Sequence, residues 1–226
     1  MTTLVIAPHP DDETLGCGGT LLAKRRRGET VHWLIVTAMD ATRVSAERRA
    51  QRKAEISAVA EKLGGLIIHR LDLPTAHLDR VEEADLIASI GAIVHDCAPQ
   101  DLFVPWIGDP HGDHRAVFLA AAACTKWFRY ESVRRVLAYE VASETDQALS
   151  PPAPAFQPNL FIDITETLND KIAAASIYAS EMGTHPFPRS TETLRALAQV
   201  RGAQAGFAAA EAFMILRQRQ DDPTAA

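Results

Sequence analysis

The sequence predicts an α/β domain of three layers, with a mainly parallel sheet between helices on both faces. Short apolar runs alternate with longer segments whose apolar residues recur at helical spacing. The short runs are apolar almost throughout, as expected for strands covered on both faces. With 226 residues and neither a linker nor an internal repeat, we expect a single domain over residues 1–219 and a disordered tail over 220–226.

The first half of the chain alternates strand and helix regularly. Thr3 to Ala7 is apolar after its first residue and predicts a strand, and the next helix ends at Gly28. Helical spacing continues from Ser45 to Leu63 and stops at Gly64-Gly65. The strands expected here are 3–7, 31–37, 66–69 and 101–105, and the helices are 18–27, 45–63 and 81–97. The alternation is typical of a Rossmann-like domain.

The second half continues the pattern with more interruptions. Residues 150–158 carry four prolines, which lack the backbone donors that a helix or an inner strand needs, so we expect a loop at the rim of a site. The remaining expected helices are 115–130, 166–180 and 191–201, and the remaining strands are 133–141, 160–164 and 212–216.

Composition excludes several classes of protein. Twenty-three basic against 29 acidic residues give a net charge of −6, which argues against nucleic-acid binding and favours a neutral or cationic small molecule. The three cysteines are far apart and form no C-x-x-C pair, which indicates a reducing compartment. No run approaches the ~18 apolar residues of a membrane span. We therefore expect a cytoplasmic protein without a membrane span.

Two polar motifs follow expected strands. His9-Pro-Asp-Asp-Glu13 comes directly after strand 3–7, and Asp109-Pro-His-Gly-Asp-His114 follows strand 101–105. The carboxyl ends of parallel strands meet at one edge of a sheet, where α/β proteins bind ligands. We expect the two strands to be neighbours and the two motifs to form one site.

The residue types in these motifs are those of a zinc site. His9, Asp12 and His114 supply three ligands and leave a fourth position open, which is typical of a catalytic rather than a structural zinc ion. Asp11 lies between two ligands and is expected to point elsewhere. The alternative is that Asp11, Asp12 and Glu13 only cap the following helix.

The motifs resemble the two signatures of the LmbE-like or PIG-L family of metal-dependent N-acetylglucosaminyl deacetylases. The first signature continues into Gly16-x-Gly18-Gly19. The resemblance extends to the C-terminal third, through the segments Tyr178-Ala-Ser180, Pro186-x-Pro-Arg189, Arg201-Gly202 and Ala210-Glu-Ala-Phe213.

The resemblance implies a role for each motif residue. His9, Asp12 and His114 would bind zinc, with iron(II) as an alternative ion, and Asp11 would be the general base. His111 would stabilise the oxyanion, and Asp113 would hold His111. Zinc lowers the pKa of its bound water to about 7, so that water could attack the amide while Asp11 accepts its proton and passes it to the amine. A protonated His111 could then share the negative charge.

Other residues have two interpretations each. Asp109 either binds a sugar hydroxyl or begins a turn at Pro110, and Arg189 could hold an anionic substituent of the substrate. Arg52 either pairs with Glu55 along its helix or lies at the pocket rim. Glu13 is expected to cap the following helix or brace the loop rather than bind metal. The remaining histidines, including His32 and His69, lack ligand spacing and are expected to be structural or exposed.

Three functions remain open. The first is zinc-dependent deacetylation of an acetamido sugar or sugar conjugate. The second is metal-dependent hydrolysis of another amide or of a phosphoester, although a phosphoesterase would want a second ion. The third is a non-catalytic sugar- or phosphate-binding module, in which Gly16-Cys-Gly-Gly19 would cradle an anion at a helix N-terminus. The sequence leaves the sugar and a homo-oligomeric state undecided.

Overall fold

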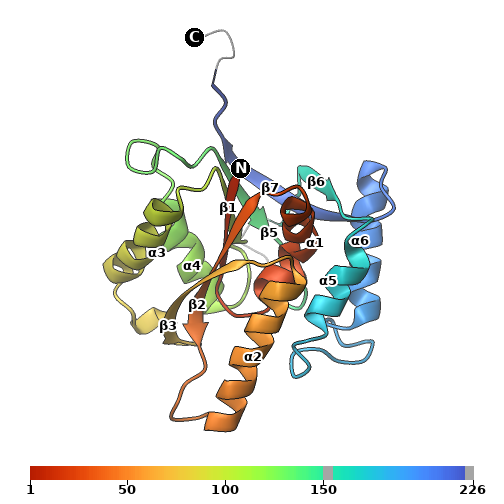
Figure 1. The fold of residues 1–226 in the computed structure, drawn as a ribbon, viewed down its shortest axis with the longest axis horizontal. Helices are drawn as coiled ribbons and strands as arrows, with labels where there is room; N and C mark the ends of the chain where they lie inside the picture. Colours follow the sequence, from red (N-terminus) through yellow and green to blue (C-terminus); the bar gives the residue numbers. More distant parts are fainter. Residues whose placement is uncertain (150–154, 222–226) are drawn as a thin grey trace.

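A seven-stranded sheet forms the centre of the protein (Figure 1). The computed structural model describes residues 1–149 and 155–221. The strands lie in the order β3-β2-β1-β4-β5-β7-β6. Their bounds are β1 (Thr2–Ala7), β2 (Thr30–Ala38), β3 (Ile67–Pro74), β4 (Asp101–Pro105), β5 (Arg135–Tyr139), β6 (Leu160–Asp163) and β7 (Ala210–Gln218).

The centre of the sheet is where the strand order reverses. The chain runs outward from β1 through β2 to β3, and then returns to β4 on the other side of β1. β1 and β4 pair in parallel, with Leu4 beside Leu102, which confirms that they are neighbours. β7 runs antiparallel to β5 and β6, so the sheet is mainly but not wholly parallel. The carboxyl ends of β1 and β4 therefore flank the crevice at which such sheets bind ligands.

Helices cover both faces of the sheet, which confirms the expected three-layer α/β architecture (Figure 1). One buried cluster, which includes Trp33, Leu63 and Tyr178, lies beneath α1, α2, α5 and α6. The other, which includes Ile90 and Val117, lies beneath α3 and α4. The helix bounds are α1 (Asp12–Arg26), α2 (Ala46–Lys62), α3 (Glu83–Cys97), α4 (Gly112–Ala123), α5 (Leu168–Ala175) and α6 (Thr191–Ala205).

Two helices begin earlier than the sequence predicts. α1 starts at Asp12 rather than at Gly18, and α4 starts at Gly112 rather than at Arg115. The motifs therefore run into the first turns of both helices. A Cβ on Gly16 would lie 2.9 Å from the Glu140 carbonyl oxygen, and one on Gly19 would lie 2.9 Å from Ile164 Cβ. The glycines thus permit close packing of α1, although glycine disfavours a helix.

The ends of other elements also differ from the prediction. α4 ends at Ala123 rather than at Tyr130, and β3 extends to Pro74 beyond the expected His69. Short 3-10 turns cover Leu78–Arg80 (η1) and Thr145–Gln147 (η2). Residues 150–154 of the proline-rich loop and 222–226 of the tail lie outside the described residues. Among the helices that the structure describes, none has the length and apolar character needed to cross a membrane.

Candidate active site

Two loops at the carboxyl edge of the sheet bring the sequence motifs together. His9 lies between β1 and α1, and Asp12 is the first residue of α1. His114 lies in the first turn of α4, which follows β4. Each side chain is thus held between a buried strand and a helix start, which is a rigid support for a site.

His9, Asp12 and His114 converge on one point. Asp12 Oδ2 lies 3.4 Å from His9 Nδ1 and 3.4 Å from His114 Nε2. One donor atom from each of the three side chains lies within 4.8 Å of the others. Asp12 Oδ2 also accepts the backbone N–H of His9 at 2.8 Å, which fixes the carboxylate against the loop. Two imidazoles and a carboxylate are the donor set that zinc uses in catalytic sites.

Asp109 orients His114. Its Oδ2 atom lies 2.8 Å from His114 Nδ1, and its Oδ1 atom accepts the Thr145 hydroxyl at 2.7 Å. Asp109 is 1% exposed, and both of its carboxylate oxygens are already engaged by His114 and Thr145. With Nδ1 bonded to Asp109, His114 Nε2 is buried and has no hydrogen-bond partner among the residues that the structure describes. In metal sites, a ligand histidine commonly bonds a carboxylate through one ring nitrogen and the metal ion through the other. The buried Nε2 atom of His114, which faces Asp12, is in the position of the second nitrogen.

Asp113 holds His9 rather than His111. Its Oδ2 atom lies 3.1 Å from His9 Nε2 and accepts the Ala76 N–H at 2.7 Å, and its Oδ1 atom accepts the Leu78 N–H at 3.3 Å. The expected side-chain bond from His111 to Asp113 is absent among the described residues. Asp113 instead directs His9 Nδ1 toward Asp12, so each of the two candidate ligand histidines has its own carboxylate partner.

The carboxylates of Asp12, Asp109 and Asp113 favour positive charge on the groups next to them. Burial alone would lower the pKa of His9, but Asp113 and Asp12 outweigh it and raise that pKa to about 9. Burial likewise opposes protonation of His114, yet Asp12 and Asp109 raise its pKa to about 10. Protons on the two imidazoles, or a divalent cation between them, would balance the carboxylates. The residues therefore fit a metal ion.

His111 is the N-cap of α4. Its Nδ1 atom accepts the backbone N–H of Asp113 at 3.1 Å, so its proton resides on Nε2. Burial and the neighbouring His9 and His114 rings lower the pKa of His111, which opposes the protonated form that we expected. A neutral imidazole can still donate one hydrogen bond through Nε2–H.

Asp11 is buried beside the ligands but faces another set of partners. Arg189 donates to its Oδ2 atom at 3.1 Å, and its backbone N–H donates to Glu13 Oε2 at 3.1 Å. Burial and the charge of Asp12 raise the pKa of Asp11 to about 7, although Arg189 opposes the shift. A carboxyl group with this pKa can both take up and release a proton near neutrality. Glu13, which is fully buried, braces the loop as expected.

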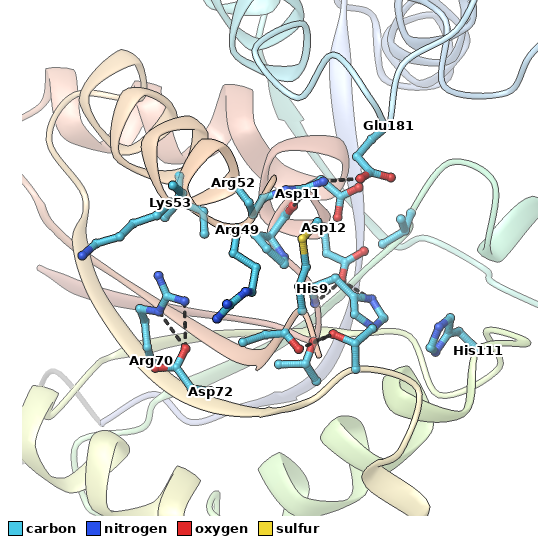
Figure 2. A pocket seen from close by; sticks show the side chains of 18 of the residues that line it. His9, Asp11, Asp12, Arg49, Arg52, Lys53, Arg70, Asp72, His111 and Glu181 are labelled. Carbon is cyan, nitrogen blue, oxygen red and sulfur yellow. Dashed lines mark hydrogen bonds and ion pairs between the residues drawn. The ribbon is translucent and has the colours of Figure 1, made fainter. Parts of the chain in front are cut away.

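The pocket extends well beyond these residues (Figure 2). It has a volume of about 670 Å³, which is in the range of sites for drug-sized ligands. His9, Asp11, Asp12 and His111 line one part of it, together with Arg189. The pocket is therefore large enough for more than the group that reacts.

Arg52 both pairs with Glu55 along its helix and lies at the pocket, so the two interpretations of its role hold together. It pairs with Glu55, with Nε to Oε2 at 3.1 Å, and it lines the pocket. It also donates to the Pro10 carbonyl at 2.8 Å and contacts Glu181. Arg52 thus ties α2 to the motif loop.

A family model described as "PIG-L: GlcNAc-PI de-N-acetylase" matches residues 4–125, more than half of the chain. The chain belongs to the PIG-L family. The diacetylchitobiose deacetylase of Thermococcus kodakarensis is 29% identical over 217 residues, covering 92% of this chain and 80% of that protein. A Mycobacterium sp. deacetylase of 1D-myo-inositol 2-acetamido-2-deoxy-alpha-D-glucopyranoside is 26% identical, covering 81% of this chain and 75% of its own length.

Solved structures agree on the architecture. The conserved protein TT1542 from Thermus thermophilus superimposes with a TM-score of 0.78 at 25% identity, over 99% of this chain and 98% of that one. The 4-carboxy-2-hydroxymuconate hydratase GalB, from a Pseudomonas strain, superimposes with a TM-score of 0.77 at 20% identity, over 99% of both chains. The same fold thus carries different reactions, and the activity must be argued from the site.

Within this PIG-L family chain, the glycine segment is not an anion cradle. Gly16, Gly18 and Gly19 lie inside α1 rather than at its N-terminus. Gly16 faces β5, and Gly19 faces Ile164, so both are buried in helix packing. The observation removes the feature that favoured a phosphate-binding module.

Several site residues escape detection in the sequence. Thr145, Glu181 and Tyr178 support Asp109, Arg52 and Glu13 from distant parts of the chain. Thr145 and Glu181 lie in none of the motifs, and the segment that contains Tyr178 does not indicate its contact with Glu13. Both facts follow from the fold, because these contacts form only when the chain returns to the same sheet edge. The C-terminal segments around Tyr178 and Arg189 are the one sequence signal that points to them.

Proposed function

We propose that the protein is a metal-dependent hydrolase that removes the N-acetyl group from an N-acetylglucosamine-type sugar or conjugate. The observation that carries the proposal is the buried Nε2 atom of His114. This atom has no hydrogen-bond partner within residues 1–149 and 155–221, and it faces Asp12 and His9 beside Asp11. Membership of the PIG-L family and the deacetylase relatives support the same reaction.

The donor set favours one ion rather than two. A second possible ligand set, His9, His111 and Asp113, reuses His9. Both oxygens of Asp113 already accept backbone N–H groups. Two-metal phosphoesterases need separate ligands for each ion, so the geometry favours amide over phosphoester hydrolysis. We propose zinc as the ion, since imidazole and carboxylate suit zinc, and iron(II) is the alternative.

His9, Asp12 and His114 would hold the ion. When bound, a divalent cation supplies a Lewis acid that polarises the acetamide carbonyl and acidifies water. Asp11 accepts the proton of the attacking water and returns it to the leaving nitrogen as the C–N bond breaks, which yields acetate and a free amine. His111 donates its Nε2–H to the developing oxyanion. Arg189 keeps Asp11 in place through their ion pair.

The test is product analysis with the purified protein. After removal of metal with a chelator and addition of Zn²⁺ or Fe²⁺, the protein is incubated with N-acetylglucosamine, N,N'-diacetylchitobiose and nucleotide-linked N-acetylglucosamine. We expect equimolar acetate and primary amine from at least one of them, and neither product without metal. Release of inorganic phosphate from p-nitrophenyl phosphate, with no acetate from any sugar, would instead support the phosphoesterase.

A further inference from the structure

The outer part of the pocket is lined by three cations from two elements. Arg49 and Lys53 lie four residues apart on α2, so they are on the same side of the helix, and Arg70 lies on β3. Figure 2 shows Arg49 extending from α2 toward Arg70, with His111 on the other side of the pocket. These three residues, which we call the cation cluster, are distinct from the hydrolytic residues.

The charges of the cation cluster are poorly balanced. Within residues 1–149 and 155–221, neither Arg49 nor Lys53 has a carboxylate within 4.0 Å, whereas Arg70 pairs with Asp72 at 2.8 Å. The Asp72 side chain is 59% exposed, so this ion pair is weak and easily exchanged. By contrast, Arg52 and Arg189 already have carboxylate partners. The anion site that the sequence suggested at Arg189 is therefore better provided by the cation cluster.

A local excess of positive charge is unexpected in this chain. The net charge is −6, from which we expected a neutral or cationic ligand. Like charges that face one another are unfavourable unless an anion lies between them. Arginine in particular binds phosphate and carboxylate groups through paired hydrogen bonds.

We propose that the cation cluster binds an anionic group of the substrate, of phosphate or carboxylate type, while the acetamido group lies at Asp11 and His111. This inference rests on the proposed function and narrows it: the substrate is an anionic conjugate of an acetamido sugar rather than a neutral sugar. The size of the pocket, about 670 Å³, suits such a two-part ligand.

The kinetic test compares matched substrates. Methyl N-acetylglucosaminide is neutral, N-acetylglucosamine 1-phosphate carries a phosphate, and N-acetylmuramic acid carries a carboxylate. We expect kcat/KM to be about 10- to 100-fold higher for one anionic substrate than for the neutral one. The double variant R49Q/R70Q should bring this ratio toward one, mainly through KM. The control R195Q, an exposed arginine on α6 outside the pocket, should leave the ratio unchanged.

A binding test separates the two proposals. Calorimetric titration with glucosamine 1-phosphate and with glucosamine needs no turnover. Stronger binding of the phosphate, lost in R49Q/R70Q, supports the cluster even if no deacetylation is found. Equal kcat/KM for neutral and anionic substrates in an active enzyme would overturn the cluster and leave the deacetylase proposal standing.

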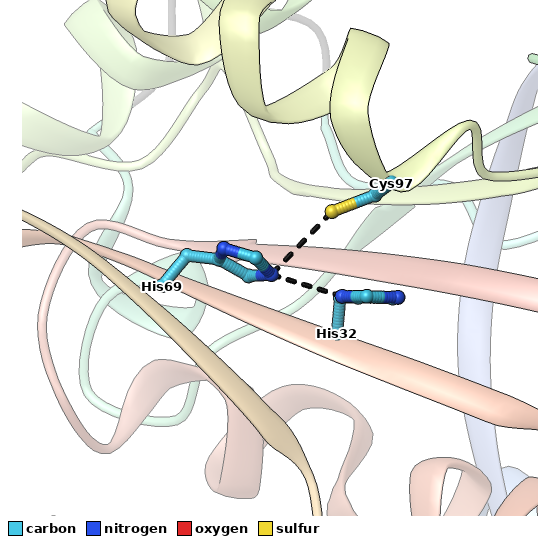
Figure 3. Close-up of side chains that lie close together, drawn as sticks. All are labelled: His32, His69 and Cys97. Atoms are coloured by element: carbon cyan, nitrogen blue, oxygen red, sulfur yellow. Dashed lines mark hydrogen bonds between the residues drawn. The ribbon is translucent and has the colours of Figure 1, made fainter.

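A separate cluster carries an independent inference. His32 on β2 and His69 on β3 lie toward the amino-terminal ends of their strands, and Cys97 is the last residue of α3 (Figure 3). His69 Nε2 lies 2.9 Å from His32 Nδ1 and 3.4 Å from Cys97 Sγ. The three donor atoms are all within 4.8 Å of one another. No spacing in the sequence indicates this cluster, because the residues meet only through the β2–β3 pairing and the end of α3.

The chemistry of these side chains suits a soft metal ion. Burial lowers the pKa values of His32 and His69, which keeps the imidazoles neutral as ligands require. Burial raises the pKa of the Cys97 thiol to about 11, so a metal ion would have to displace its proton. Two imidazoles and a thiolate select Zn²⁺ or Co²⁺ over Mg²⁺ or Ca²⁺.

We infer that His32, His69 and Cys97 form a second metal site, which binds a thiophilic divalent cation and ties the edge strand β3 to β2 and α3. The site lies at the opposite end of the strands from the pocket. A metal ion there would therefore take no part in the proposed hydrolysis.

The test uses Co²⁺ as a spectroscopic probe. A thiolate–Co²⁺ charge-transfer band distinguishes this cluster from the candidate site at His9, Asp12 and His114, because those three side chains contain no sulfur. We expect the band in the reduced wild-type protein and in H114A, and its loss in C97S. Absence of the band in the wild-type protein would overturn the site. Persistence of the band in C97S would also overturn it, because the thiolate would then belong to Cys17 or Cys124.

Discussion

Asp11 and Asp12 are adjacent in the chain but have opposite environments. Asp12 faces two imidazoles, which outweigh its burial and lower its pKa. Asp11 faces Arg189 and the pocket, and burial beside the Asp12 charge raises its pKa. A pair of carboxyl groups whose pKa values are driven apart is the pattern expected of a ligand next to a proton carrier.

Replacing Asp11 should separate catalysis from metal binding. We expect D11N to keep metal stoichiometry while kcat falls by about 10²- to 10⁴-fold, because the amide cannot accept a proton. Metal analysis and a deacetylation assay on the same preparation measure both effects. H114A is the contrasting variant, for which we expect loss of metal. A D11N protein that turns over at the wild-type rate would contradict the role of Asp11.

The residues that the sequence identifies are those with recognisable donor chemistry. His9, Asp11, Asp12, His111 and His114 could be named because two strand-end motifs contain them all. The partners of Asp109 and Asp113 could not be named. Several histidines lie near these carboxylates, and the sequence does not indicate which imidazole each carboxylate contacts. For Asp113, the backbone N–H groups of Ala76 and Leu78 donate to its carboxylate and fix its orientation.

At the scale of elements, α1 has the helix start that departs most from the sequence prediction. Three glycines within five residues indicate a loop by intrinsic propensity. The helix forms nevertheless because its glycines permit close approach to β5 and to the segment after β6. Tertiary packing outweighs the low helix propensity of glycine here, and these packing contacts cannot be predicted from a single sequence.

The close packing of α1 predicts a sharp difference between two glycine substitutions. In G16A the added methyl group would lie 2.9 Å from the Glu140 carbonyl oxygen, whereas in G18A its nearest neighbours are at 3.5 Å. We expect G16A to lower the free energy of unfolding by about 1–3 kcal/mol. G18A should be neutral or slightly stabilising. Urea denaturation measures both variants, and equal stabilities would contradict the packing argument.

Asp101 joins three elements and should make stability depend on pH. It accepts hydrogen bonds from Lys24 of α1 at 2.8 Å and from Arg135 of β5 at 2.8 and 3.0 Å. Burial alone would raise the pKa of Asp101, but Arg135 and Lys24 outweigh it and hold the pKa below its ordinary value. Because the folded-state pKa is depressed, the stabilisation is complete above the unfolded-state pKa of about 3.9 and is lost as the pH falls below it.

We therefore expect D101N to be less stable than the wild-type protein by about 3 kcal/mol at pH 7, with a smaller difference below pH 4. Urea titrations at both pH values test this. D170N is the matched control, since Asp170 also has two basic partners, Arg26 and Lys62, but is more exposed. Its effect should stay below about 1 kcal/mol. A D101N difference that is independent of pH would contradict the ion-pair explanation.

At the scale of the molecule, the proposed ion joins the two halves of the sheet. His9 and Asp12 follow β1, whereas His114 follows β4, and the chain between them forms β2, β3 and their helices. A ligand that binds the folded chain and not the unfolded one stabilises the fold. The metal should therefore act on the stability of the whole protein.

Metal removal should lower the melting temperature. At a free Zn²⁺ concentration 100-fold above Kd, binding adds about 2.7 kcal/mol, which corresponds to a shift of about 5 to 10 °C for a chain of this length. Thermal unfolding after dialysis against a chelator, with and without added Zn²⁺, measures the shift. We expect a smaller shift in H114A. An identical shift in that variant would place the ion elsewhere.

The bond from Thr145 to Asp109 has a consequence for protein engineering. Thr145 follows β5 and fixes the carboxylate that orients His114, so the start of the loop between β5 and β6 belongs to the support of the proposed metal site. Exchange of this loop between homologues, to change which conjugates are accepted, should therefore begin after Thr145. A graft that begins earlier would alter substrate choice and ligand geometry together, and the two effects could not be selected separately.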